Sequence, residues 1–181
     1  MARSADTRLA AFTIISSAAF AGGNLFIGLS MGGYWLSLSA EAFKMTFFGQ
    51  WLFFLLTIMP LFLMTLYGLV RSSRRDADDP HLRAIWRRAI QCWIATFLIT
   101  LLYHMPLNLR LGAATFSPEE AATSGLYGVL SIFGSVTPEN AAFTRAIWLI
   151  GHLARIALAI AISILAIQAA FDRRDRAALS A

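Results

Sequence analysis

Residues 146–171 read AIWLIGHLARIALAIAISILAIQAAF, with Arg155 as their one charged side chain. A helix needs about 20 predominantly apolar residues to cross the ~30 Å hydrocarbon core of a bilayer, and this stretch is long enough. Three other runs have the same character: residues 9–31, 47–70 and 84–105. The sequence therefore predicts an all-α fold, an integral membrane four-helix bundle in which residues 1–181 form a single membrane domain.

The composition supports this class. The chain is 58% hydrophobic and 14% charged, whereas about a quarter of the residues of a soluble domain are charged. The net charge of +5 does not indicate a nucleic-acid-binding protein, because the basic residues stand between apolar runs and form no basic face interleaved with aromatics. Cys92 is the single cysteine, so we expect neither a disulfide framework nor a multi-cysteine metal site.

The distribution of basic residues predicts the orientation. Eleven arginines flank one side of the four runs, and three basic residues flank the other. The positive-inside rule assigns the larger set to the cytoplasm. We therefore predict a multi-pass protein of the cell inner (plasma) membrane with cytoplasmic N- and C-termini. The larger set is Arg3, Arg8, Arg71, Arg74, Arg75, Arg83, Arg87, Arg88, Arg173, Arg174 and Arg176, and the smaller is Lys44, Arg110 and Arg145.

The two outer connections differ in length. Residues 32–46 are predicted to form a short loop. Residues 106–145 are longer and contain two helix starts, Ser117-Pro118-Glu119-Glu120 and Thr137-Pro138-Glu139, so the outer connection between helices 3 and 4 is expected to be partly helical. Its apolar part, residues 126–133, is too short to span a bilayer. We interpret it as a re-entrant or surface-lying lid, or alternatively residues 121–145 as a contact surface for a membrane-protein partner.

Polar side chains recur on shared helical faces near the outer ends of the runs. Trp148, His152 and Arg155 follow i, i+4, i+7 spacing, which places them on one face of the fourth helix. On the third helix His104 and Asn108 are four residues apart. Polar groups are costly in hydrocarbon and usually face the interior of a bundle. We therefore predict one outer-leaflet pocket.

A sixth polar residue, Asn24, lies in the outer half of the first run and is also predicted to border the pocket. Purely structural roles compete with this prediction. Asn24 is typical of a residue that joins helices by hydrogen bonds, and Arg155 can clamp a helix end by binding loop carbonyls. No acidic residue lies within a run, so an acidic partner for Arg155 has to come from a loop, from Glu41, Glu119 or Glu120. Four tryptophans near the ends of the runs are expected at the membrane interface, namely Trp35, Trp51, Trp86 and Trp148.

Two segments, Tyr103-His104-Met105-Pro106-Leu107-Asn108 and Trp148-Leu149-Ile150-Gly151-His152-Leu153-Ala154-Arg155, resemble the anthrone oxygenase-like family of small four-helix membrane proteins. The glycine-rich stretch 20–33 resembles the family's first helix. The resemblance implies oxidation of an anthrone to an anthraquinone by oxygen, with no known metal or flavin. It assigns Asn108, His152 and Arg155 to the site, and His104 less directly. Residues 121–145 depart from the family pattern.

Three functions follow. The first is a membrane oxidase or oxygenase that acts on a lipophilic aromatic compound, with His152 as base, Arg155 and Asn108 stabilising an enolate, and His104, Asn24 and Trp148 binding the ligand. No cofactor is predicted for it. The second is a haem- or quinone-binding protein, since two facing histidines in a helix bundle permit that. The third is a non-catalytic accessory subunit of a larger membrane complex.

Overall fold

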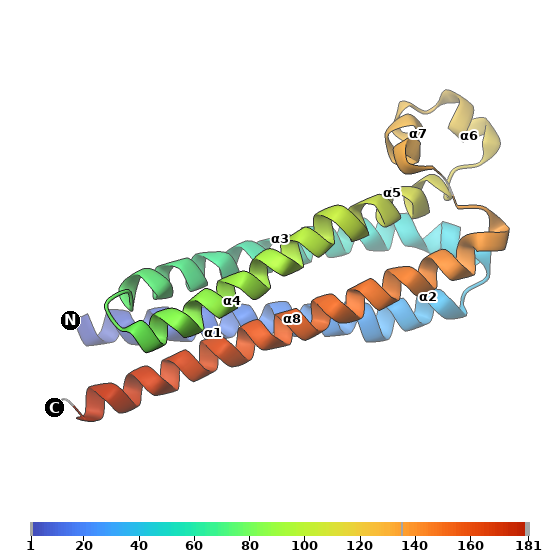
Figure 1. The fold of residues 1–181 in the computed structure, drawn as a ribbon. Helices are drawn as coiled ribbons and strands as arrows, with labels where there is room; N and C mark the ends of the chain where they lie inside the picture. The colour runs from blue at the N-terminus through green and yellow to red at the C-terminus, as the bar shows by residue number, and fades with distance from the viewer. Residues whose placement is uncertain (1, 135, 180–181) are drawn as a thin grey trace. The chain divides into compact units, whose positions relative to one another are not determined.

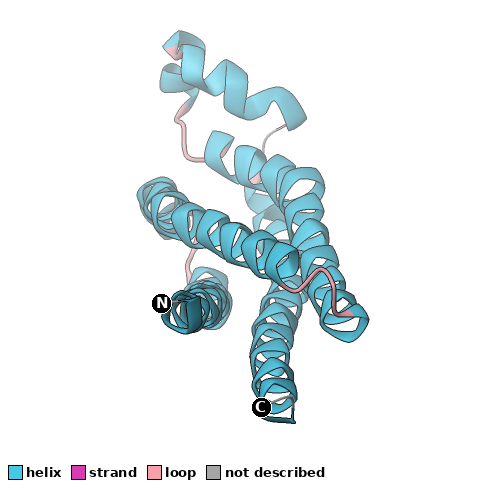
Figure 2. Cartoon of the chain, turned by 90° about the vertical axis from the view of Figure 1, so that its left-hand side faces the viewer, coloured by secondary structure: helices cyan, strands magenta, loops and turns pink. Residues whose placement is uncertain are grey.

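The structure is a computed structural model that describes residues 2–134 and 136–179. Met1, Ser180 and Ala181 lie outside the described residues, as does Ser135 within the segment 121–145. The described chain forms helices and connecting turns, and no β-strand (Figures 1 and 2). Its elements are α1 (Ala2–Leu25), the π-helix η1 (Phe26–Gly32), α2 (Gly33–Ser37), α3 (Ala40–Arg75), α4 (Pro80–Ile99), the π-helix η2 (Thr100–His104), α5 (Met105–Ala113), α6 (Pro118–Thr123), α7 (Gly125–Leu130), the 3₁₀-helix η3 (Ser131–Phe133) and α8 (Pro138–Leu179).

The all-α prediction is confirmed for the described residues. Four helical segments are long and apolar enough to cross a membrane, and each predicted run lies within one continuous helical segment. The helices extend beyond the predicted runs because their polar ends continue the same hydrogen-bonding pattern. The four apolar segments are Thr7–Ser37, Gly49–Arg75, Pro80–Ala113 and Asn140–Arg176, and the run 47–70 lies within the longer helix α3, Ala40–Arg75.

The prediction of a loop over residues 32–46 is wrong. The chain is helical to Ser37 and again from Ala40. The Ser39 side chain accepts a hydrogen bond from the backbone N–H of Ala42 at 3.2 Å, so that it caps α3. The segment joins two predicted spans, but local propensity is a weak signal that tertiary packing overrides. Here the packing comes from Trp35, Phe43 and Phe47, which are all buried.

The connection between α5 and α8 is partly helical, as predicted. Ser117 caps α6 and forms a capping box with Glu120, and α8 begins at the predicted Pro138. α7 and η3 pack on α5, where Leu130 is buried against Gly112. We call residues 118–133 the lobe.

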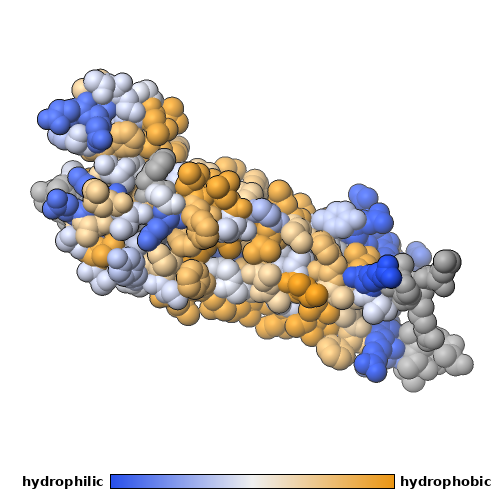
Figure 3. All heavy atoms as spheres, turned by 180° about the vertical axis from the view of Figure 1, so that it is seen from behind, coloured by the Kyte–Doolittle hydropathy of each residue, from blue (hydrophilic) through white to orange (hydrophobic). Residues whose placement is uncertain are grey.

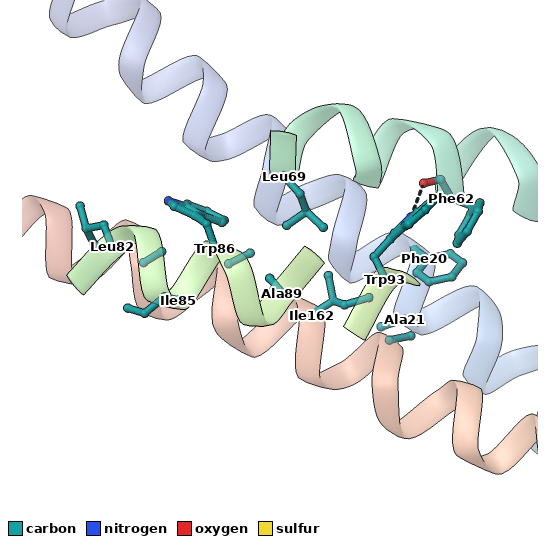
Figure 4. Close-up of a cluster of buried hydrophobic side chains, with 13 residues drawn as sticks. Phe20, Ala21, Phe62, Leu69, Leu82, Ile85, Trp86, Ala89, Trp93 and Ile162 are labelled. Atoms are coloured by element: carbon teal, nitrogen blue, oxygen red, sulfur yellow. Dashed lines mark hydrogen bonds between the residues drawn. The ribbon is translucent and has the colours of Figure 1, made fainter. Parts of the chain in front are cut away.

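The chain divides into two compact units. Unit 1 comprises residues 1–24, 57–96 and 156–181, and unit 2 comprises residues 25–56 and 97–155. The core of unit 1 is a cluster of buried side chains from α1, α3, α4 and α8 (Figure 4). In it Phe62 and Trp93 stack with ring centroids 4.1 Å apart, and the Trp93 indole donates to the Phe62 carbonyl at 3.0 Å. Fully buried alanines, Ala89, Ala159, Ala166 and Ala169, allow close approach of helices.

Asp76, in the turn between α3 and α4, joins three elements of unit 1. Its carboxylate accepts from Arg75 Nε and Nη2 at 2.8 and 2.7 Å and from the Trp86 indole at 2.9 Å, and Arg173 Nε on α8 lies 3.4 Å away. Burial alone raises the pKa of Asp76, but these hydrogen bonds and the two guanidinium charges outweigh it, so the pKa lies below its ordinary value of 3.8. The carboxylate is therefore charged at neutral pH.

A second set of contacts ties the same turn to the end of α8. Asp79 caps α4, accepting from the backbone N–H groups of His81 and Leu82 at 2.9 and 3.1 Å, which lowers its pKa. Its other oxygen accepts from Arg176 at 2.9 Å. His81 Nε2 lies 2.7 Å from an oxygen of Asp172. Ion pairs thus fix the α3–α4 turn against α8.

We predict that Asp76→Asn destabilises the protein by about 1.5–3 kcal/mol at pH 7, the range for hydrogen bonds to charged groups. Because the folded-state pKa is depressed, the stabilisation is complete above the ordinary value of 3.8 and is lost as the pH falls through the lower folded-state value. Thermal unfolding in detergent from neutral to acidic pH measures this. The difference in unfolding temperature between variant and wild type should be constant above pH 3.8 and should narrow as the pH falls below 3.8. Asp78→Asn, at an exposed residue of the same turn, should leave stability unchanged. A gap of equal size at every pH would contradict the prediction.

Candidate functional site: the histidine cluster of unit 2

A π-helical turn positions His104. Pro106 has no backbone N–H and cannot donate to the carbonyl four residues earlier. The chain accommodates this with the π-helix η2, closed by a bond from the Met105 N–H to the Thr100 carbonyl five residues back. His104 is the last residue of this turn, and its side chain is fully buried.

The imidazole rings of His104 and His152 contact each other directly. Their centroids are 5.6 Å apart and their planes cross at 85°. Trp148 lies against both rings: it stacks on His152 at 4.9 Å and 10°, and meets His104 edge to face at 5.5 Å. Trp148 and His152 stack because they are one turn apart on α8. We call these three residues and Asn108 the histidine cluster.

Asn108 joins the cluster through a hydrogen bond. Its Oδ1 accepts from the Trp148 indole N–H at 2.7 Å, which links α5 to α8 and leaves the amide N–H groups to donate elsewhere. The other side of Trp148 contacts Trp35, at 5.1 Å between centroids. The Trp35 indole in turn donates to Gln50 Oε1 at 2.6 Å. The cluster therefore belongs to a continuous set of packed rings with specific polar contacts.

Tyr103 sets the approach of the third helical segment to α8. Its hydroxyl donates to the Ile147 carbonyl, and its ring lies over Gly151, where a Cβ atom would overlap it. Tyr103 and Ile147 precede His104 and Trp148 in the chain. The close approach at Gly151 therefore brings His104 into contact with Trp148 and His152 on α8.

Arg155 completes the site from one turn further along α8. It is near enough to His104 for the two groups to interact electrostatically. Its Nε is buried and has no hydrogen-bond partner among the described residues. The backbone at Ile99 and at Trp148 is close to the His104 ring, but neither ring nitrogen makes a hydrogen bond of good geometry within the described chain. The two ring nitrogens of His104 and the Nε of Arg155 are therefore available to a further hydrogen-bonding group.

The expected acidic partner of Arg155 is not found. Glu120 closes the capping box of α6, and Glu41 and Glu119 are exposed. In the part of the chain that the structure describes, no ion pair joins Arg155 to a carboxylate. The early turns of α6 and α3 use or expose these acids, so none of the three serves as the counterion of Arg155.

The predicted site residues therefore fall into two groups. The structure brings His104, Asn108, Trp148 and His152 together in unit 2, with Arg155 beside them. Asn24 belongs to unit 1, where its amide donates to the Phe20 carbonyl at 2.8 Å. That bond is one a structural asparagine in an apolar helix makes.

The tryptophan prediction needs correction. Trp35, Trp86 and Trp148 were expected at the membrane interface, but only 2%, 1% and 4% of their surfaces are exposed. Each indole N–H donates to a side chain of the protein, which is what allows a tryptophan to be buried. The acceptors are Gln50, Asp76 and Asn108 respectively.

Arg145 is a further residue whose role the sequence did not reveal. It was counted among the outer flanking charges, yet it is 6% exposed. Its Nη1 donates to the carbonyls of Trp35 and Leu38 at 2.6 and 2.9 Å, and its Nε donates to the Ala141 carbonyl at 3.2 Å. Its guanidinium carbon also lies 5.0 Å from the Phe43 ring centroid. Arg145 therefore fixes the end of α2, and with it Trp35, which packs on Trp148 of the cluster.

No group of three or more His, Cys, Asp or Glu side chains that suits a metal ion occurs among the described residues. The two imidazoles touch each other, so a porphyrin would fit between them only after the rings separated. Comparisons with protein-family models, with curated proteins and with solved structures found no match. The residues of the site themselves therefore carry the functional argument.

We predict that Gly151→Ala destabilises the protein by about 1–3 kcal/mol, the cost of forcing extra atoms into a packed contact. The added methyl overlaps the Tyr103 ring. Gly33→Ala is the matched control, because its new methyl meets no atom within 4 Å. Thermal unfolding measures both. In a Tyr103→Ala background the Gly151 substitution should cost much less, and equal costs in the two backgrounds would contradict the proposed contact.

Proposed function

We propose that the chain is a four-helix integral membrane protein of the inner (plasma) membrane, with both termini and the α3–α4 turn in the cytoplasm. Four apolar segments of sufficient length support this. The orientation is supported by the eleven arginines on one side. On the opposite side, Arg145 is buried in a clamp, which leaves Lys44 and Arg110 as the other basic residues there.

In this membrane protein the histidine cluster binds a lipophilic aromatic compound that carries a carbonyl group, and oxidises it. One observation carries the proposal: Arg155 stands beside the buried His104–His152 contact with no carboxylate partner in the described chain. A charge and polar rings in an apolar helix are costly and usually serve function. An oxygen atom of a ligand would satisfy both Arg155 and the His104 ring.

The reaction suited to these groups begins at a C–H bond made acidic by a neighbouring carbonyl and aromatic rings. His152 takes the proton, and negative charge moves to the carbonyl oxygen. Arg155 and the amide N–H groups of Asn108 are the donors for that developing enolate. Trp148, stacked on His152, offers an aromatic face beside the base.

Dioxygen is the oxidant in this scheme. The carbanion adds O₂, and the proton held by His152 returns to the resulting peroxide. His152 then takes the second proton from the same carbon as the O–O bond breaks, the electrons of that C–H bond form the new carbonyl, and the departing hydroxide takes the proton and leaves as water. A CH₂ group and O₂ thus give C=O and H₂O, and the electrons come from the substrate. The residues of the site supply a base and hydrogen-bond donors. This is the chemistry that the resemblance to the anthrone oxygenase-like family implies.

The test is oxygen uptake by the purified protein with an anthrone, which has a CH₂ group made acidic by a carbonyl across aromatic rings. We predict that His152→Gln lowers the rate by about 10²-fold or more, because a positioned base contributes that much. Arg155→Gln should lower it comparably, and Arg155→Lys less. His81→Gln is the matched control, since His81 is an exposed histidine of unit 1. Absence of uptake in wild type, or full activity of His152→Gln, would overturn the proposal.

A Soret band in the purified protein would instead favour haem held by His104 and His152, and binding of a quinone without turnover would favour a quinone site.

A second candidate function is that of an accessory subunit of a membrane complex. The observation that favours it is the apolar outer face of the lobe. Leu126, Val129, Ile132 and Phe133 are between 48% and 69% exposed, and they lie within the segment 121–145. Exposed apolar patches often mark interfaces.

This candidate predicts that Ile132→Ser with Phe133→Ser removes a specific partner from complexes solubilised from native membranes. Both side chains are exposed, so the folded protein should keep its thermal stability. Met45→Ser is the control, because Met45 is an exposed apolar residue of α3 outside the segment 121–145. Co-purification that is unaltered by the lobe variant, as judged by quantitative mass spectrometry, would count against the accessory role.

A further inference from the structure

The arginines of unit 1 around the α3–α4 turn divide into two kinds. Three of them have ion-pair partners: Arg75 and Arg173 bind Asp76, and Arg176 binds Asp79. Two carboxylates thus offset part of the charge of these three arginines, and the ion pairs join the turn to α8.

The other arginines there are exposed, and none has a hydrogen bond or ion pair in the described chain. They project from the last turns of α3, the first turns of α4 and the end of α8. We call them the arginine patch: Arg71, Arg74, Arg83, Arg87, Arg88 and Arg174. Blue, hydrophilic side chains gather at the right-hand end of the view in Figure 3.

The first turns of α4 show how the patch is displayed. Leu82, Ile85 and Trp86 are buried on one face of this helix, and Arg83 and Arg87 are exposed on the other, one turn apart. This amphipathic pattern fixes the direction of the arginines. Burial of the apolar face of α4 therefore directs Arg83 and Arg87 away from the protein interior.

The patch adjoins apolar surface on the same helices. Tyr67, one turn before Arg71 on α3, is 57% exposed, and the apolar segments Gly49–Arg75 and Pro80–Ala113 end and begin at the patch. An exposed tyrosine beside a span end is typical of the membrane interface. In a membrane the patch would therefore stand at the depth of the lipid phosphates.

From this arrangement we infer that the arginine patch binds the phosphate groups of anionic phospholipid headgroups. A guanidinium binds phosphate in a bidentate manner, which a lysine ammonium does not. All the basic residues of this region are arginines, and the one lysine of the chain, Lys44, lies elsewhere. A positive-inside orientation alone requires only positive charge. Clusters of four to eight basic residues next to a span are typical of sites for anionic lipid.

The inference rests on membrane insertion but not on oxidase activity, so the two proposals fail separately. The protein is reconstituted in nanodiscs of phosphatidylcholine and phosphatidylglycerol in equal amounts, then extracted mildly, and the lipids that remain bound are quantified by mass spectrometry. We predict enrichment of phosphatidylglycerol on wild type. The triple variant Arg83→Gln, Arg87→Gln, Arg88→Gln should reduce that enrichment by about fivefold for each arginine removed, which corresponds to about 1 kcal/mol each. The control Lys44→Gln, Arg110→Gln should retain it.

Inorganic phosphate added to the protein in neutral detergent distinguishes the source of the phosphate group. The inference expects phosphatidylglycerol, and not inorganic phosphate, to raise the thermal unfolding temperature of wild type. A rise with inorganic phosphate alone would assign the patch to a free anion and overturn the lipid inference. Equal binding of both lipids by wild type, or undiminished enrichment on a triple variant whose unfolding temperature matches wild type, would also overturn it.

Discussion

The absence of a side chain at Gly151 is the constraint on which the site in unit 2 depends. Only a residue without a Cβ lets the Tyr103 ring lie against α8 and its hydroxyl reach the Ile147 carbonyl. That contact fixes the register between the third helical segment and α8. The neighbouring residues then meet, so that His104 contacts both Trp148 and His152.

A second constraint acts from within the third segment. Pro106 cannot donate a backbone hydrogen bond, and the chain adjusts with the wide π-turn that ends at His104. Arg145 acts from the other side, where its bonds to the Trp35 and Leu38 carbonyls hold the end of α2. The cluster is therefore held by backbone features and by an arginine that are not themselves part of its proposed chemistry.

The sequence predicted the parts of this arrangement that follow from periodicity. Long apolar runs identified four helices because length and composition decide whether a helix can span a membrane. Spacing of three and four residues also grouped Trp148, His152 and Arg155 on one face of α8. Contacts between helices do not follow from spacing within one helix. The sequence therefore gave no indication that Asn108 would accept from Trp148, or that Trp35 would be buried.

The errors have the same physical origin. Residues 32–46 contain glycines and serines, and their helical structure depends on the burial of Trp35 and Phe43, which local propensity does not register. Arg145 was read as a flanking charge because a sequence shows the charge and not the carbonyls that surround it. The lobe was predicted better, since Ser117 and Glu120 carry their capping signal within four residues.

The buried or partly buried arginines differ in whether their guanidinium groups have hydrogen-bond partners within the described chain. Buried Arg145 binds three backbone carbonyls, and half-buried Arg75 binds Asp76. These bonds offset the cost of removing a guanidinium from water. Arg155 has a buried Nε without a hydrogen bond in the described chain, so its cost is not offset in this way. Arg110 shares this feature, but of the two only Arg155 lies one turn from His152 on α8. Because Arg155 adjoins the histidine cluster, the oxygen of a ligand bound there is the partner that its position favours.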